Sequence, residues 1–175
     1  MFSRYPEIPV KRVNPDAPMP KYAHKGDAGL DLCAIEDVTL RPGEWQMVKS
    51  GISVAIPNGY VGMVCPRSGM GCKGLVLKNT IGVIDAPYRG EIGIPLFNNN
   101  PKTDKLVAHV TVVDGERVVA MEPEGTIHVS NGDRVAQLII LPCCGANVYE
   151  VDELDKTERQ EGGFGSTGIS GGPRP

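Results

Sequence analysis

The stretch VTVVDGERVV, residues 110–119, decides the fold class, because two runs of β-branched residues flank an Asp-Gly pair. Asp114-Gly115 adopts positive φ at little cost, as the tight two-residue turns of β-hairpins require. The stretch therefore predicts two antiparallel strands joined at Asp114-Gly115. Asn58-Gly59 and Asn131-Gly132 are pairs of the same kind and predict further turns.

Outward from this hairpin, short β-type runs bounded by turn residues recur at nearly regular intervals, which is typical of a sandwich or barrel. No helical stripe persists for three turns; single turns are expected at Ser68–Lys73 and at Asp152–Arg159. The predicted strands are Ile8–Val13, Gly29–Ala34, Asp37–Leu40, Gln46–Ile56, Tyr60–Cys65, Gly74–Leu77, Glu91–Phe97, Leu106–Val113, Arg117–Met121, Thr126–Val129, Arg134–Leu141 and Asn147–Val151.

Composition narrows the class of protein. The 175 residues carry a net charge of −3, and 22 glycines and 15 prolines spread along the chain exclude an all-helical bundle. The longest apolar stretch, Leu138–Cys144, is interrupted by Pro142 and is too short for a membrane span. The first residues, MFSRYPEIPVKRV, lack the apolar core of a secretory signal. We therefore expect a cytoplasmic protein, in the host cytoplasm if the source is viral, with neither a membrane nor a nucleic-acid partner.

Cysteine and histidine spacing argues against a disulfide framework and against a protein-held transition metal. The five cysteines include an adjacent pair, Cys143-Cys144, but no C-x-x-C, so we expect reduced and mostly packed thiols. The histidines His24, His109 and His128 are scattered and have no recognised ligand spacing. Because the net charge of the chain is negative, binding of a polyanionic ligand would depend on arginines close to the binding site.

Three polar segments could carry chemistry. In the tail, GGFGSTG at 162–168 follows Arg159 and offers backbone amides, hydroxyls and a ring for a nucleobase, although such a tail is also an ordinary solvated linker. PRSG at 66–69 sets an arginine and a hydroxyl at the end of a strand. Asp85 follows an apolar strand and could deprotonate a water, yet it could equally initiate a turn before Ala-Pro.

Together, five segments resemble the motif set of the trimeric dUTP pyrophosphatases (dUTPases). They are DAGLDL at 27–32, PRSG at 66–69, GVIDAPYRGE at 82–91, GDRVAQL at 132–138 and RQEGGFGSTG at 159–168. The resemblance implies an all-β, distorted jelly-roll domain over residues 1–155 and a flexible arm over 156–175. It also implies a homotrimer whose active sites are each shared by three subunits and closed by the arm.

The resemblance implies hydrolysis of dUTP to dUMP and pyrophosphate, which supplies dUMP for thymidylate synthesis and keeps uracil out of DNA. Asp85 resembles the residue that orients the attacking water, and Tyr88 the ring that packs on deoxyribose. Mg²⁺ is the implied cofactor; it has no direct protein ligand, and Asp31 reaches its hydration shell through water. The other implied substrate contacts are Arg67, Ser68, Gly69 and Gln137 on the phosphates, Asn79, Val83 and Ile84 at the base, and Arg159, Phe164, Gly165, Ser166 and Thr167 in the closing arm.

Two alternatives stay open at this point: a dCTP deaminase-like enzyme, and a non-catalytic nucleotide-sensing regulator that kept the site for binding. The GGFGSTG tail and PRSG favour dUTP hydrolysis over the deaminase-like activity. The presence of Asp85 favours hydrolysis over a regulator that only binds the nucleotide. The segment between the third and fourth motifs, residues 98–131, is longer than the resemblance leads us to expect. We therefore interpret the hairpin at about 104–125 as an insertion. We hypothesise that it is a surface arm that contacts a regulatory protein.

Overall fold

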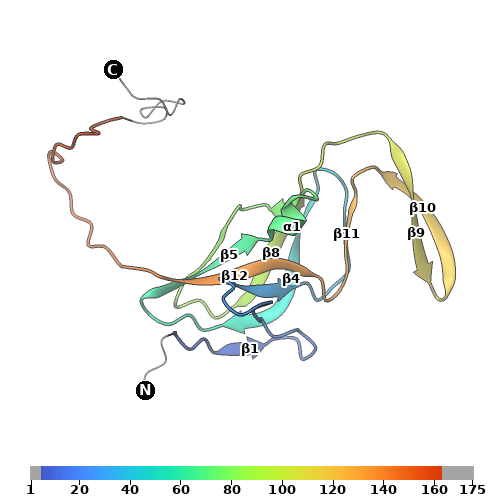
Figure 1. The fold of residues 1–175 in the computed structure, drawn as a ribbon, viewed down its shortest axis with the longest axis horizontal. Coiled ribbons are helices and arrows are strands. Elements are labelled where there is room, and N and C mark those ends of the chain that lie inside the picture. The colour runs from blue at the N-terminus through green and yellow to red at the C-terminus, as the bar shows by residue number, and fades with distance from the viewer. Residues whose placement is uncertain (1–4, 163–175) are drawn as a thin grey trace. The chain divides into compact units, whose positions relative to one another are not determined.

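The computed structural model describes residues 5–162, and its strands form two four-stranded and two two-stranded antiparallel sheets (Figure 1). One four-stranded sheet has the order β2 (Gly29–Cys33), β12 (Arg134–Pro142), β5 (Tyr60–Pro66), β7 (Gly82–Ile84). The other has the order β1 (Val10–Arg12), β4 (Trp45–Val54), β8 (Glu91–Asn98), β6 (Leu75–Leu77). The small sheets pair β3 (Val38–Leu40) with β11 (Ile127–Val129), and β9 (Leu106–Val113) with β10 (Glu116–Pro123). One short helix, α1, spans Ser68–Gly71.

The two four-stranded sheets share one apolar core. In β8 the side chains of Ile92, Ile94 and Leu96 point inward, as alternation along a strand requires, and all three are essentially inaccessible to solvent. Val48 in β4 and Leu138 in β12 are buried in the same cluster. The architecture is the expected all-β jelly-roll sandwich.

Turn chemistry predicted the hairpin correctly. Asp114 (φ 53°) and Gly115 (φ 83°) both lie in the left-handed region, and β9 and β10 pair without a bulge from Leu106↔Pro123 to Val113↔Glu116. This hairpin, β9–β10, projects from one end of the sandwich (Figure 1). The helical turn expected at Ser68–Lys73 is also present, as α1.

Two expected elements are absent from the described part of the chain. The strand predicted over Asn147–Val151 is irregular and exposed, and Asp152–Arg159 forms bends instead of a helical turn. Val148 and Tyr149 are almost fully solvent-exposed, and among residues 5–162 no strand pairs with this segment, so its alternating apolar pattern forms no ladder.

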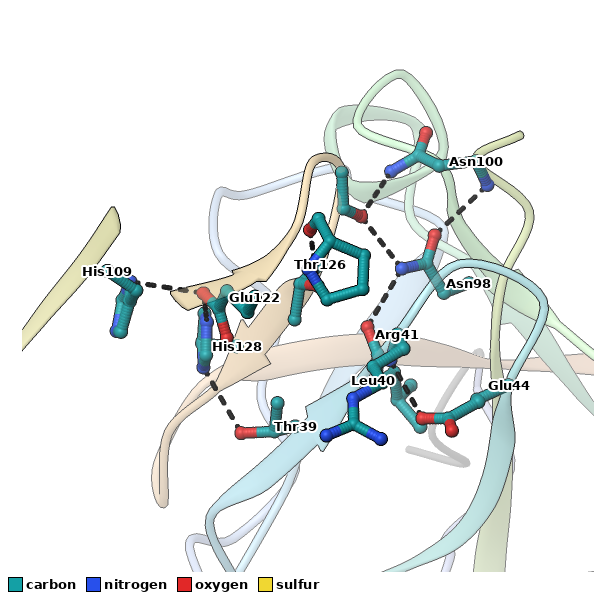
Figure 2. A network of polar contacts seen from close by, with 12 residues as sticks. Thr39, Leu40, Arg41, Glu44, Asn98, Asn100, His109, Glu122, Thr126 and His128 are labelled. Atoms are coloured by element: carbon teal, nitrogen blue, oxygen red, sulfur yellow. Dashed lines mark hydrogen bonds and ion pairs between the residues drawn. The ribbon is translucent and has the colours of Figure 1, made fainter. Parts of the chain in front are cut away.

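A polar network closes the base of the hairpin (Figure 2). Asn98, at the end of β8, is completely buried, and its Nδ2 donates to the carbonyl oxygens of Leu40 and Gly125, both at 2.8 Å. Its Oδ1 accepts from the Asn100 backbone N–H at 3.0 Å, and Asn100 in turn donates to the Gly125 carbonyl. Asn98 therefore links β3, β8 and the segment that leaves the hairpin.

The chain divides into two units, Met1–Cys144 and Gly145–Pro175. Residues 145–155, expected within the jelly-roll domain, thus group with the second unit. Among residues 5–162, no helix is long and apolar enough to cross a membrane.

Candidate functional site

A cavity of about 450 Å³ opens beside β7, an edge strand of its sheet. Asn79, Val83, Ile84, Asp85 and Tyr88 line it, so the structure brings together five of the residues expected to hold a nucleoside. Because β7 pairs only with β5 in its sheet, one edge of its backbone faces away from the ladder. This edge can donate and accept hydrogen bonds toward a planar ligand. We call this cavity the β7 cavity.

The opposite wall of the β7 cavity comes from β4 and β8, and sequence reasoning missed it. Met47 and Pro95 are paired residues of these strands, and Gly93 lies two residues before Pro95. A Cβ on Gly93 would come within 2.7 Å of the Met47 sulfur, so a larger residue at this position would displace the Met47 side chain. Only the register of β4 on β8 places these residues together, which no local motif encodes.

Asp85 ends β7, and a tight loop holds its neighbourhood in place. The Tyr88 N–H donates to the Asp85 carbonyl at 3.0 Å, and Pro87 fits this turn because the donor belongs to Tyr88. The Tyr88 hydroxyl donates to the Glu91 carbonyl at 2.9 Å. Arg89 Nη1 donates to the carbonyls of Ala86 (2.6 Å) and Tyr88 (2.7 Å). The loop therefore presents the Tyr88 ring to the cavity in a fixed orientation.

The turn before β7 is conformationally strained. Thr80 has φ of 63°, in the left-handed region that a β-branched residue rarely occupies. Its hydroxyl donates to the Asn79 carbonyl at 2.6 Å, and the Ile81 N–H donates to the same oxygen at 2.7 Å. The turn thereby sets Asn79 at the cavity wall. Such strain persists where the surrounding structure over-determines it, as at binding sites.

A second group of expected residues meets around Asp31, which is only 9% exposed. Its Oδ1 lies 3.0 Å from Arg67 Nε, and its Oδ2 lies 3.1 Å from Arg134 Nη1. Arg67 Nη1 also donates to the Arg134 carbonyl at 2.9 Å. We call Asp31, Arg67, Arg134 and Gln137 the Asp31 cluster. The carboxylate neutralises part of the arginine charge and fixes both guanidinium groups, while further N–H donors of each remain for an anion.

Gln137 joins this cluster through the sheet register. It lies opposite Asp31 on one side and opposite Cys65 on the other, and its Nε2 donates to the Pro66 carbonyl at 3.1 Å. A Cβ at Gly29 would come within 2.5 Å of Gln137 Oε1, so the glycine of DAGLDL makes room for this amide.

Ser68 and Gly69 follow Arg67 directly and form the first turn of α1. Space is open around the Gly69 Cα. A hollow of about 280 Å³ borders Arg67 and Arg134 and also Lys73 and His128. The residues that line the β7 cavity and those that border this hollow do not overlap.

Arg134 is the residue of the Asp31 cluster that sequence reasoning did not single out. A signal for it existed, because a carboxylate embedded in a strand must find a cationic partner when it is buried. GDRVAQL supplies that cation three residues before Gln137.

All five cysteines are free, as expected, but only two are packed. Cys33 and Cys65 are half-buried, whereas Cys72, Cys143 and Cys144 are exposed, so the expectation of mostly packed thiols was wrong for these three. Burial raises the pKa of the Cys33 thiol, and the nearby Asp31 carboxylate raises it further. Burial also raises the pKa of the Cys65 thiol. Both therefore favour the neutral, unreactive form.

The closing arm is described only as far as Gly162. Arg159 Nε donates to the Gly162 carbonyl at 2.9 Å, within its own segment. Phe164, Gly165, Ser166 and Thr167 lie outside the described residues.

Comparison with known proteins is consistent with these features. A model of the dUTPase family matches residues 15–118 and 115–168. A protein of Thermobifida fusca named deoxyuridine 5'-triphosphate nucleotidohydrolase is 43% identical over 162 residues, which are 92% of this chain and 78% of the relative. A protein of the same name from Cutibacterium acnes is 42% identical over 168 residues, or 95% of this chain and 96% of the relative.

Solved structures extend the likeness to three dimensions. A variant of the Staphylococcus bacteriophage 80alpha dUTPase with dUpNHpp superposes with a TM-score of 0.84 at 34% identity, over 93% of this chain and 99% of that one. The dUTPase of phage phi11 of S. aureus, described for its species-specific insert, has a TM-score of 0.76 at 34% identity, over 87% and 100% of the two chains. Another variant of the phi11 enzyme is described for its coordination of a structural Mg(II) ion.

Proposed function

Because the chain belongs to the dUTPase family, we propose that it hydrolyses dUTP to dUMP and pyrophosphate through attack of a water on the α-phosphorus. The observation that carries this proposal is the β7 cavity. It combines an exposed strand edge, an aromatic ring and a carboxylate at one opening. In this scheme dUMP serves thymidylate synthesis, and uracil stays out of DNA.

In the proposed mechanism, β7 reads the uracil edge through the backbone groups of Val83 and Ile84, with Asn79 beside them. A pocket that hydrogen-bonds one base leaves its polar groups unpaired with another, which supports strong discrimination. The Tyr88 ring packs on the sugar, where a 2′-hydroxyl would collide with it. Asp85, next to the sugar, orients the water and accepts its proton.

The Asp31 cluster serves the triphosphate. Arg67, with Ser68 and Gly69 beside it, and Gln137 bind the phosphate oxygens in this proposal, and Asp31 holds Arg67 in place. Phosphoryl transfer depends mainly on such positioning and charge neutralisation, so no nucleophilic side chain is needed.

The residues around Asp31 fit Mg²⁺ as a water-bridged ion. Both carboxylate oxygens are engaged by arginines, which disfavours direct ligation, yet each keeps a lone pair for a metal-bound water. Among residues 5–162, no cluster of three or more carboxylates forms a cage for a hard cation. When bound, Mg²⁺ supplies charge neutralisation to the triphosphate, and Asp31 orients its hydration shell.

The lining of the β7 cavity includes no residue of the Asp31 cluster, which supports a shared site. We propose a homotrimer in which the β7 cavity of one subunit meets the Asp31 cluster of another. Arg159, Phe164, Gly165, Ser166 and Thr167 of an arm over residues 156–175 close over the nucleotide. The protein acts in the cytoplasm, and its hairpin at about 104–125 contacts a regulatory protein. Light scattering that gives a monomer would contradict the shared site.

The decisive experiment compares Asp85→Asn with Asp114→Asn, a matched control in the hairpin turn, where asparagine also tolerates positive φ. Pyrophosphate release from dUTP with Mg²⁺ should fall about 10²–10⁴-fold for Asp85→Asn and stay at the parental rate for the control. Affinity for dUpNHpp should be kept in both variants, because Asp85 serves the water and not the ligand. A parental rate for Asp85→Asn would overturn its role.

The same assay of pyrophosphate release also tests the choice of substrate. dCTP, dTTP and UTP should release little pyrophosphate, and ammonia release from dCTP would instead identify the deaminase-like alternative. Binding of dUTP without any release would identify the sensing alternative. Truncation after Thr157 should keep the fold and the trimer but nearly abolish turnover.

A further inference from the structure

A group of three side chains at the root of the hairpin has no part in the proposed hydrolysis. Glu122 of β10 pairs with Val107 of β9, so it lies on the same face as His109, two residues further along β9. His128 comes from β11, the strand that follows the hairpin. Three strands thus bring two imidazoles and one carboxylate together, although the sequence spaces them irregularly.

Both histidines direct a ring nitrogen at one carboxylate oxygen (Figure 2). His128 Nε2 lies 2.7 Å from Glu122 Oε1, and His109 Nδ1 lies 3.5 Å from the same atom. The three ligand atoms all lie within 4.8 Å of one another. Around a tetrahedral zinc with bonds of about 2.0–2.1 Å, neighbouring ligand atoms are about 3.3 Å apart. The two measured distances bracket that value.

A fourth residue orients the donor set. Thr39 of β3 lies opposite His128 in the β3–β11 pair, and its hydroxyl is 3.1 Å from His128 Nδ1. In the metal-free form His128 Nε2–H donates to the Glu122 carboxylate. A metal replaces that proton, and Nδ1–H then donates to the Thr39 hydroxyl, the usual arrangement for a ligating histidine. The Glu122 side chain is only 15% exposed, whereas each histidine is about one-third exposed, so the group is partly shielded and still open to an ion.

We propose that His109, Glu122 and His128 form a binding site for a divalent transition metal of the zinc type, with water as the fourth ligand. Two imidazoles and one carboxylate match zinc and its neighbours better than magnesium, which prefers oxygen ligands only. Bound metal crosslinks β9 and β10 to β11 and so fixes the hairpin on the sandwich. The site differs from the proposed water-bridged Mg²⁺ at Asp31 in ligands and in place.

The ring geometry defines the change that binding requires. The two imidazoles are stacked, with centroids 3.9 Å apart and an interplanar angle of 12°. Parallel rings cannot both point an in-plane lone pair at one ion, so at least one ring must rotate. His109 is the less tightly held ring, because its Nδ1 lies 3.5 Å from Glu122 whereas His128 has contacts of 2.7 Å and 3.1 Å at its two nitrogens. The metal-bound form should therefore have splayed rings, and the stacked form is the metal-free one.

The test uses the full chain in a Cys143→Ser/Cys144→Ser background, which removes the adjacent exposed thiols as competing ligands. Chelator-treated protein is titrated with Co²⁺ by absorption spectroscopy and with Zn²⁺ against a chromophoric chelator. We expect one ion per chain and a cobalt spectrum without thiolate charge transfer. A stoichiometry below one, or a thiolate spectrum, would overturn the site.

Variants locate the ion. His128→Gln should lose affinity by more than the ~10–100-fold typical of changes to an orienting partner, and Thr39→Val should lose about that amount. His24→Gln is the matched control, since its side chain is 84% exposed and lies outside the cluster. If His128→Gln fails to fold, His109→Gln on the exposed hairpin replaces it. Parental affinity in either folded histidine variant would refute the proposal.

A second readout follows the hairpin itself. Zn²⁺ should slow hydrogen exchange in β9 and β10 of the parent and of His24→Gln, but not of His128→Gln. Unchanged exchange upon saturation with zinc would contradict the crosslink. Mg²⁺ alone should leave this exchange unaffected.

Discussion

Two antiparallel pairs of this chain, β4–β8 and β9–β10, are built from similar residues and end in opposite environments. Val48 and Ile94 face each other in β4–β8 and are fully buried, whereas Val110 and Val119 face each other in β9–β10 with 53% and 61% exposed. The more regular ladder is the exposed one, because β4–β8 has an irregularity between Lys49 and Ser53 and the hairpin has none. Pairing and apolar content are therefore enough for a strand to form in both regions. Whether its side chains are buried depends on whether another sheet packs on the strand.

The largest expected difference between the two pairs is in stability. Ile94→Ala leaves a cavity in the core and should lower the free energy of unfolding by about 2–5 kcal/mol. Val119→Ala removes exposed surface and part of one cross-strand contact, so its cost should stay below about 1 kcal/mol. Urea unfolding with a common m-value checks both. Similar losses in the two variants would mean that the hairpin is buried in solution, for instance against another molecule.

Asn98 stands where the two regions meet and should give the next largest effect. Asn98→Leu removes the donor to the Leu40 carbonyl and one of the donors to the Gly125 carbonyl, at about 1–3 kcal/mol for the buried acceptor left unpaired. Asn99→Leu is the matched control, since the neighbouring side chain is exposed. Thermal unfolding should separate the two variants. Equal melting temperatures would show that the network does not stabilise the fold.

A smaller effect is expected at the tip of the hairpin. Gly115 has φ of 83°, so Gly115→Ala should cost about 1–2 kcal/mol locally. Because few buried contacts couple the hairpin to the core, the loss should appear as faster hydrogen exchange in β9 and β10, with little change in global stability. Gly71→Ala, a control without positive φ, should leave that exchange unchanged. A fall in global stability for Gly115→Ala would show that the hairpin and the sandwich unfold together.

Local sequence signals predicted much of this fold. Asp114-Gly115 determined the hairpin turn, and the alternation in β8 determined which side chains point inward, because both signals act between near neighbours. The same reasoning failed at Asn147–Val151, where the pattern is right for a strand but no partner strand is present among residues 5–162. A strand needs a second strand, and its own residues do not say where that strand lies.

The candidate sites divide in the same way. Asp85 and Tyr88 belong to one continuous segment and were predictable together, whereas Met47 and Gly93 reach the β7 cavity only through the register of β4 on β8. The histidines were judged too scattered to hold a metal, because their spacing carries no signal until β9, β10 and β11 assemble. If the proposed metal site is confirmed, the expectation that this protein holds no transition metal is wrong.

The smallest expected effect concerns the thiols and extends the contrast between covered and uncovered residues. Burial raises the pKa of the Cys33 and Cys65 thiols above the ordinary value of 9.0, so at pH 9 they should react with iodoacetamide more slowly than exposed Cys143 and Cys144. The unfolded chain releases these two protons at lower pH than the folded chain does. The free energy of unfolding should therefore decline slightly as pH rises above 9.0, and Cys33→Ser/Cys65→Ser should weaken that decline. Mass spectrometry of the labelled peptides follows each cysteine separately. Equal labelling rates at all four positions would show that β2 and β5 open so readily that their thiols are as accessible as those of the exposed segment after β12.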